Sequence, residues 1–362
     1  GVRLDRLSKN IIRKKRMNKI REVVTYDDVL LVPQYSDIES RRQINLSGEL
    51  TDTQLRLPII SSPMDTVTEA HMCESMSAAG GIGVIHRYNT VEEQAALAKA
   101  AIEKGTKNIA AAIGVTGDYI DRAIALHDEG VKILCIDVAH GHHILVQAAI
   151  KSLRDIFGDS IHIMAGNVAT LDGFNALAEW GADSVRCNIG GGSICTTRIQ
   201  TGHGVPGLHT IFECASSVHA GKVKIIADGG IRSSGDIVKA LAAGADFVML
   251  GSLLAGTTQS PGELIRNYAS GNGESRKVYR GMASADAQNA WRGRTSSLEG
   301  VATTIPFKGD VKAIIEKLEN GIRSGLSYSG AKSIGELHRK AIFVRQTDSG
   351  RSEAQAHIAR IS

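Results

Sequence analysis

The chain has 362 residues and a mass of 38.5 kDa, with 43% apolar and 22% charged residues, which is ordinary globular usage and excludes a disordered or fibrous protein. Aromatic residues make up only 4%, which argues against a protein that stacks the bases of single-stranded nucleic acid. The five cysteines form no CxxC pair, so we expect neither a disulfide framework nor a zinc knuckle, and a reducing, cytoplasmic setting is indicated. No run of roughly 18 apolar residues and no secretion signal is present, so no membrane insertion is expected.

The net charge of +4 is unevenly distributed along the chain. Residues 1–22 hold nine Lys and Arg against two acidic residues, a balance of +7, which leaves the rest of the chain at −3. We predict a flexible basic extension over residues 1–22 and read Met17 as the start of the protein proper, with the stretch before it as an upstream addition. A nucleic-acid-binding arm is the alternative, and it is not favoured.

From residue 57 onward, short apolar runs alternate with helical patterns. Each run is followed by a cluster of Gly and polar residues. Eight runs covered by helices predict a (β/α)8 barrel, because clusters after every strand would then converge on one catalytic face; a doubly wound sheet is the alternative. The predicted strands are 57–61, 82–85, 109–113, 133–136, 161–165, 184–187, 224–227 and 247–250, and the helices between them are 69–79, 91–104, 119–129, 144–156, 171–179, 210–219 and 237–243.

After residue 272 the alternation ends. A polar, Gly-, Ser- and Arg-rich stretch at about 283–300 predicts a flap, residues 311–341 indicate two further helices as an extension, and 346–362 indicate a polar tail. We therefore predict a single catalytic domain over 23–345.

The loop after the sixth predicted strand carries the clearest chemical signal. Its three successive glycines, 190–192, let the backbone approach a ligand, and Ser193 adds a hydroxyl suited to a phosphate oxygen. Cys195 lies in the same polar loop and is therefore a candidate nucleophile, whereas the other four cysteines lie in or beside apolar runs and are interpreted as core residues.

Two later turns add phosphate-binding capacity, because barrels commonly bind phosphate with the loops after strands seven and eight. They are Asp228-Gly229-Gly230 and Gly251-Ser252, and Asp228 would accept both hydroxyls of a ribose. The histidines at 140, 142 and 143 are interpreted as surface residues rather than metal ligands, since no carboxylate partner has ligand spacing.

These motifs, in this order, resemble the IMP dehydrogenase / GMP reductase family from residue 26 to residue 347. The matching segments are YDDVLL at 26–31, SSPMDTVTE at 61–69, GNV at 166–168, GSICTTR at 192–198, DGGIR at 228–232, YRGM at 279–282 and EG at 299–300. The resemblance implies a purine nucleotide with its phosphate at Ser193, Gly230, Gly251, Ser252 and Tyr279, its ribose at Asp228, and Cys195 attacking C2 of the base. It further implies substrate contacts at Ser62, Gly229, Gly281, Met282 and Gly300, and cofactor contacts at Asp137, Ala139, Asn167 and Met282.

The family contains two activities, and the resemblance favours an NADPH-dependent GMP reductase. In reductases a Thr two residues after the Cys pairs with a Glu, and Thr197 and Glu299 stand at those positions. Dehydrogenases use an Arg-Tyr pair on a long flap to activate water, and here the stretch between Gly281 and Glu299 is short and contains no such pair.

An IMP dehydrogenase using NAD+ is the alternative, with potassium held by the carbonyls of Gly190, Gly192 and Cys195. Segments 61–65, 228–236 and 252–257 lean toward dehydrogenases, and Asn188 replaces a glycine usual in both groups. A non-catalytic nucleotide-binding protein is the remote alternative. The regulatory CBS modules of many dehydrogenases, which would enter near 89–93, are absent there, and the resemblance implies a homotetramer.

Overall fold

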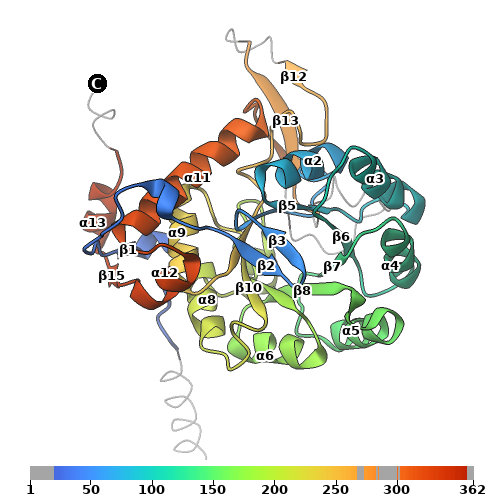
Figure 1. Ribbon diagram of the computed structural model, residues 1–362, viewed down its shortest axis with the longest axis horizontal. Helices are drawn as coiled ribbons and strands as arrows, with labels where there is room; N and C mark the ends of the chain where they lie inside the picture. Colours follow the sequence, from blue (N-terminus) through green and yellow to red (C-terminus); the bar gives the residue numbers. More distant parts are fainter. Residues whose placement is uncertain (1–19, 267–272, 283, 285–299, 301, 357–362) are drawn as a thin grey trace, which may run out of the picture.

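The chain folds into a closed parallel β-barrel surrounded by helices (Figure 1), and the computed structural model describes residues 20–266, 273–282, 284, 300 and 302–356. The strands follow one another around the ring in chain order, and β11 closes the ring against β4. This confirms the predicted (β/α)8 barrel and excludes the doubly wound sheet. The barrel strands are β4 (Ile59–Ser61), β5 (Ile82–Ile85), β6 (Ile109–Ile113), β7 (Ile133–Asp137), β8 (His162–Val168), β9 (Ser184–Cys187), β10 (Lys224–Asp228) and β11 (Phe247–Leu250).

Helices cover the outside of the ring, as predicted from the Ala- and Leu-rich stretches (Figure 1). The eighth position is taken by α11 (Val311–Tyr328), which packs against both α9 and α2. What the sequence indicated as an extension therefore completes the helical ring. The others are α2 (Ala70–Ala79), α3 (Val91–Glu103), α4 (Tyr119–Asp128), α5 (Ile144–Phe157), α6 (Leu171–Trp180), the short α7 (Thr197–Thr201), α8 (Gly207–Ala215) and α9 (Ser234–Ala243).

Local sequence signals set several helix boundaries. The Thr90 hydroxyl accepts the Glu93 N–H at 3.1 Å while Glu93 accepts the Thr90 N–H at 2.9 Å, a reciprocal capping box that starts α3. The Ser233 side chain accepts the Asp236 N–H, so α9 begins three residues before the predicted start at 237. No inserted domain separates β5 from α3.

Two apolar layers stabilise the barrel. Inside the ring, buried side chains from alternate strand positions pack together, with Ile60, Val84 and Met249 among them. The hairpin of β2 (Gly48–Leu50) and β3 (Thr53–Leu55) inserts Leu50 and Leu55 into the same cluster and closes the amino-terminal end of the barrel. Between strands and helices lies the larger outer core, so the open end of the barrel is the carboxyl end of the strands.

Two segments near the ends of the described chain lie together beside the barrel, at the left of Figure 1. Strand β1 (Val29–Leu31) pairs antiparallel with β15 (Phe343–Arg345), and the Gln346 N–H donates to the Asp28 carbonyl at 2.9 Å. The predicted polar tail thus begins with contacts to the amino-terminal segment, although α13 (Asp348–Glu353) has no buried residue. The remaining short elements are η1 (Tyr26–Asp28), η2 (Arg41–Gln43), η3 (Gly158–Ser160), which directly follows α5, and α12 (Ile334–Lys340).

Most of the predicted basic extension, residues 1–19, lies outside the described residues. Its last two residues are held by ion pairs, Arg21 with Glu213 at 2.7 Å and Glu22 with Arg345. At least that end of the expected flexible segment is therefore attached to the barrel.

A three-stranded antiparallel sheet projects from the barrel after β11 (Figure 1). It consists of β12 (Ile265–Arg266), β13 (Ser275–Arg280) and β14 (Ala302–Pro306), with β13 in the middle. The predicted flap at 283–300 connects β13 to β14, and of it only Ser284 and Gly300 are described.

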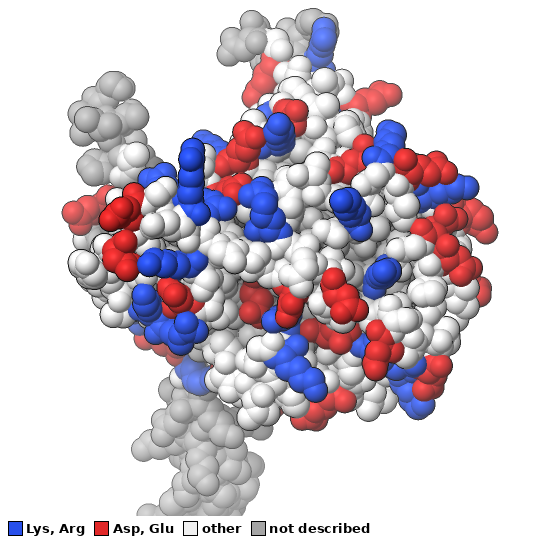
Figure 2. Space-filling view, in the orientation of Figure 1, with Lys and Arg blue, Asp and Glu red and all other residues white. Residues whose placement is uncertain are grey.

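Charged residues of both signs are interspersed over the face shown in Figure 2. None of the helices in the described ranges is long and apolar enough to cross a membrane.

Candidate active site

The carboxyl ends of the barrel strands surround a cleft of about 400 Å3. This size suits a nucleotide-sized ligand. The cleft brings together every site residue predicted from the sequence except Glu299, which lies outside the described residues. Its lining includes Ser62, Asp137, Ala139, Asn167, Gly190, Gly192, Ser193, Cys195, Thr197, Asp228, Gly229, Gly230, Gly251, Ser252, Tyr279, Gly281, Met282 and Gly300.

The glycine loop after β9 forms one wall of the cleft. Within the described chain, the N–H groups of Gly191, Gly192 and Ser193 form no hydrogen bond, so they remain able to bind an anion. The side chain of Arg198 braces the base of the loop, because its guanidinium donates to the carbonyls of Ile189 at 3.4 Å and Val205 at 2.9 Å. The loop is thus fixed at its base and presents backbone donors to the cleft.

The turns after β10 and β11 form the opposite wall. Gly229 and Gly230 have φ values of 90° and 75°, a left-handed conformation that glycine adopts without strain. A Cβ at Gly251 would lie 3.1 Å from the Tyr279 hydroxyl, so the glycine leaves room for that phenol to enter the cleft. Burial raises the pKa of Tyr279, while the neighbouring Ser193 side chain opposes the shift, and the phenol therefore stays a neutral donor.

Cys195 is the only cysteine of the described chain that is not buried. Its Sγ lies 3.1 Å from the Thr197 Oγ1, and its backbone forms an antiparallel bridge with Gly300. By contrast, burial raises the pKa of Cys73 and of Cys187, and it raises the pKa of Cys135 to about 12. Only Cys195 therefore combines access to a ligand with a hydroxyl partner that can share its proton.

Two carboxylates at the floor of the cleft are joined by Arg186 on β9. Its Nη1 donates to Asp137 at 2.8 Å and its Nη2 donates to Asp228 at 2.9 Å. Burial acts to lower the pKa of Arg186, but the carboxylates and the Cys135 thiol raise it well above the ordinary value. Asn167 also donates to Asp228, at 2.8 Å, so this carboxylate is held in one orientation with one side facing the cleft.

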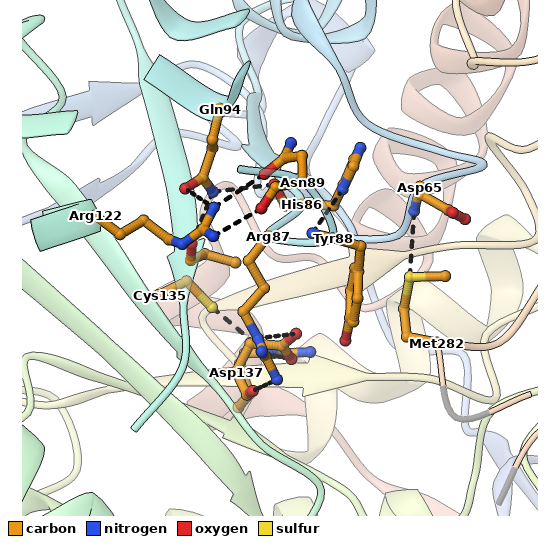
Figure 3. A network of polar contacts seen from close by, with 12 residues as sticks. Asp65, His86, Arg87, Tyr88, Asn89, Gln94, Arg122, Cys135, Asp137 and Met282 are labelled. Atoms are coloured by element: carbon orange, nitrogen blue, oxygen red, sulfur yellow. Dashed lines mark hydrogen bonds and ion pairs between the residues drawn. The ribbon is translucent and has the colours of Figure 1, made fainter. Parts of the chain in front are cut away.

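Arg87 and Tyr88, which follow β5, line the cleft beside Asp137 (Figure 3). The Arg87 guanidinium lies 5.2 Å from the centre of the Tyr88 ring and donates to the Asp137 carbonyl at 3.1 Å. Its Nε is shielded from solvent and forms no hydrogen bond within the described chain, but it lies 3.7 Å from the Asp137 Oδ2 as an ion pair. Arg87 is thus held against Asp137 at the floor of the cleft.

Sequence reasoning did not assign Arg186, Arg87 or Tyr88 to the site. A signal was present for Arg186, because an arginine within the apolar run 184–187 requires a buried partner. For Arg87 the signal was the polar cluster directly after a strand.

The mouth of the cleft is bounded by residues before the flap. Arg280 forms an ion pair with Asp65 at 2.5 Å, and the Asp65 N–H donates to the Met282 sulfur at 3.4 Å (Figure 3). These contacts attach Arg280 and Met282, which directly precede the flap, to the loop after β4.

Other sequence-based expectations fall at the rim. His140, His142 and His143 are exposed, and His143 accepts the Leu145 N–H at 3.1 Å at the start of α5. In the part of the chain that the structure describes, no group of three His, Cys, Asp or Glu could hold a metal. Of the carbonyls expected to hold potassium, that of Gly192 accepts the Cys195 N–H at 3.1 Å.

Comparisons with known proteins identify relatives in a single protein family. A sequence model described as the IMP dehydrogenase / GMP reductase domain matches residues 23–357. The inosine-5'-monophosphate dehydrogenase of Cryptosporidium parvum is 36% identical over 93% of this chain and 96% of the relative. The GMP reductase of Leishmania major is 31% identical over 93% of this chain and 97% of the relative.

A solved structure is similar across the whole fold. It is GMP reductase from Trypanosoma brucei, a cysteine-to-alanine variant in complex with guanosine 5'-monophosphate, with a TM-score of 0.88 and 31% identity. The similarity covers 94% of this chain and 99% of that one.

Proposed function

Because this chain belongs to the IMP dehydrogenase / GMP reductase family, we propose that it is an NADPH-dependent GMP reductase. In that reaction GMP, NADPH and two protons become IMP, NADP+ and ammonium. The relatives include both activities of the family, so the choice depends on the residues of this chain that would act on the Cys195 adduct.

The cleft suits a purine nucleoside monophosphate. The phosphate would accept hydrogen bonds from the N–H groups of Gly192 and Ser193 and would contact Gly230, Gly251, Ser252 and Tyr279. Asp228 would accept hydrogen bonds from the ribose hydroxyls. The base would then extend toward Cys195, past Ser62 and Gly229, beneath Gly281, Met282 and Gly300.

Covalent chemistry is assigned to Cys195. Its sulfur adds to C2 of the guanine base, and the C2–N bond breaks as ammonia leaves. Thr197, at 3.1 Å from the sulfur, and Glu299 relay the proton that the amino group needs in order to depart. When bound, the cofactor supplies the hydride to C2, after which the carbon–sulfur bond breaks and the thiol is restored.

The residues at the inner side of the mouth fit a nicotinamide. Its carboxamide needs one donor and one acceptor, which the Arg87 guanidinium and the Asp137 carboxylate beside it would supply. Asp137, Ala139, Asn167 and Met282 are the proposed cofactor contacts.

One observation carries the choice of reductase. The segment from Met282 to Leu298 contains no tyrosine, so it has no Arg-Tyr pair that could activate water against a Cys195 adduct. Without such a pair, water is not activated, so the adduct reacts with hydride instead of being hydrolysed.

The test follows the loss of reduced cofactor by absorbance, with ammonium measured in the same reaction. We expect consumption with GMP and NADPH in equal amounts to ammonium release, and at least a thousandfold loss of rate in Cys195→Ala, on the order found for removal of a nucleophile. Turnover that persists in Cys195→Ala, with the variant folded, would contradict the covalent mechanism.

IMP dehydrogenase is the second candidate. It is favoured by the 36% identity to the Cryptosporidium dehydrogenase and by the segments 61–65 and 228–236. NAD+ would be the oxidant, and potassium would be held at Gly190, Gly192 and Cys195. Formation of reduced cofactor from IMP and NAD+, stimulated by potassium, would establish this activity in place of the first.

The remaining parts of the proposal are a homotetramer and a cytoplasmic location. Sedimentation of the purified chain with and without nucleotide measures the assembly directly, and a monomer under both conditions would contradict the tetramer.

A further inference from the structure

Asn188, the first residue after β9, has a backbone conformation that side chains rarely adopt. Its φ is 149°, and within the described chain only Thr51 is another non-glycine residue with positive φ. Such conformations persist where the surroundings impose them, and they cluster at functional sites. The side chain is also buried, with only 4% of its surface exposed.

The Asn188 carboxamide occupies space between three glycines. A Cβ at Gly191 would lie 2.0 Å from its Nδ2, and Cβ atoms at Gly207 and Gly229 would lie 3.0 Å and 3.4 Å from the same nitrogen. Those glycines belong to the Cys195 loop, to the start of α8 and to the turn after β10. One side chain therefore fills the junction of three segments.

Polar contacts of Asn188 join the same segments. Its Nδ2 donates to the Gly229 carbonyl at 3.4 Å, and its own carbonyl accepts the Asn167 Nδ2 at 3.0 Å. Asn167 in turn donates to Asp228. The residue thus links the loop that carries Ser193 and Cys195 to the turn that carries Asp228 and Gly230.

Stability does not explain this side chain. The Asn188 Oδ1 is shielded from solvent and has no hydrogen-bond partner in the described part of the chain, which is unfavourable for a buried acceptor. Glycine at position 188 would remove both the unpaired acceptor and the backbone strain.

We propose that Asn188 is a positioning residue for the nucleotide, which holds the loop 189–195 against the turn 228–230 before the ligand arrives. Three successive glycines would otherwise lose much conformational freedom on binding, and that loss weakens affinity. The inference rests on the proposed nucleotide site, but it applies equally to GMP and IMP.

The packing also predicts a reciprocal relation with position 191. Because Asn188 leaves no room for a Cβ at Gly191, Gly191→Ala displaces the loop when Asn188 is present. In Asn188→Gly the same alanine has space, so the second substitution is better tolerated there.

The experiment measures equilibrium binding of GMP and of IMP to the full chain by calorimetry, together with the thermal midpoint. Asn188→Gly is expected to weaken binding of both nucleotides about tenfold while its midpoint is equal to or above that of the wild type. Asn188→Ala, which retains the strain, is expected to weaken binding similarly without raising the midpoint. Gly191→Ala should bind less tightly than the double variant Asn188→Gly/Gly191→Ala.

Unchanged affinity in Asn188→Gly would overturn the proposal, as would a variant that fails to fold or a loss of affinity that tracks a lower midpoint. A double variant weaker than both single variants would overturn the reciprocal relation. If the wild-type chain binds neither nucleotide, the proposed function itself fails, which is a different result from binding that is indifferent to position 188.

Discussion

At the scale of single residues, the barrel separates polar groups that serve its two ends. Arg186 and Asn167 orient Asp228 at the open end, while His162 lies at the closed end, where its Nδ1 is 2.8 Å from the Thr51 hydroxyl and its Nε2 is 2.7 Å from the Ser184 hydroxyl. Arg186 and Asn167 thus orient a carboxylate of the candidate site, whereas His162 links the β2–β3 hairpin to β8 and β9.

His162 gives the stability of the protein a defined dependence on pH. Burial is the main cause that lowers its pKa from 6.5 to about 4, so the unfolded chain takes up a proton before the folded chain does. Stability is fully present above about pH 6.5 and falls as the pH drops toward 4, by about 3 kcal/mol in total. Urea unfolding across this range measures it.

The control for that experiment is His162→Gln, which has no titrating group at this position. Its free energy of unfolding should change less between pH 6.5 and 4 than that of the wild type. Equal pH dependence in both proteins would show that His162 is not buried in its neutral form.

At the scale of elements, the loops after the strands are held from behind by the helices. The clearest case is Arg122 on α4, whose guanidinium is buried and donates to the Asn89 Oδ1 at 2.9 Å, to the Asn89 carbonyl at 2.7 Å and to the Gln94 Oε1 at 3.0 Å (Figure 3). These bonds fix the segment that begins with Arg87 and Tyr88. A helix outside the barrel therefore sets the geometry of two residues in the cleft.

Arg122→Met is expected to release this segment and to lower the free energy of unfolding by about 3 kcal/mol, because several buried acceptors lose their donor. Hydrogen exchange should become faster at residues 86–94 than elsewhere. Lys151→Met is the matched control, since its ion pair with Asp155 is exposed on both sides and contributes little. Similar effects of the two substitutions would contradict the role of Arg122.

At the scale of the whole molecule, β1 and β15, which lie near the two ends of the described chain, pair on one side of the barrel. Phe343 on β15 packs edge to face on Phe212 of α8 at 5.0 Å between ring centres, while β15 pairs with β1. Strands β1 and β15 are separated by more than three hundred residues in the sequence.

Truncation tests this closure. A chain ending at Ile342 loses β15 and the Phe343 ring, so its thermal midpoint should fall by several degrees, as expected for a large protein that loses about 2 kcal/mol. A chain ending at Gln355 keeps both and should unfold like the full chain. Equal midpoints for the two truncated chains would show that the pairing contributes nothing.

The barrel could be predicted from the residues alone, and most of the cleft from the residues together with the family resemblance. Eight apolar runs, each followed by Gly and polar residues, are local patterns, and a parallel ring brings their carboxyl ends together whatever the details of packing. That is why Cys195 and Asp228 could be placed in one site before their contacts were known, whereas the place of Tyr279 and the reading of the flap composition came from the family resemblance.

The contacts made across the barrel could not be predicted from the sequence and are known from the folded structure. That α11 is the eighth helix, that Arg186 joins Asp137 to Asp228, and that Asn188 fills the space of three glycines all depend on residues distant in sequence. A residue pattern reports periodicity and local turn chemistry, but which buried charge meets which partner, and where a side chain excludes a Cβ, is set by the packing of segments that no local pattern relates.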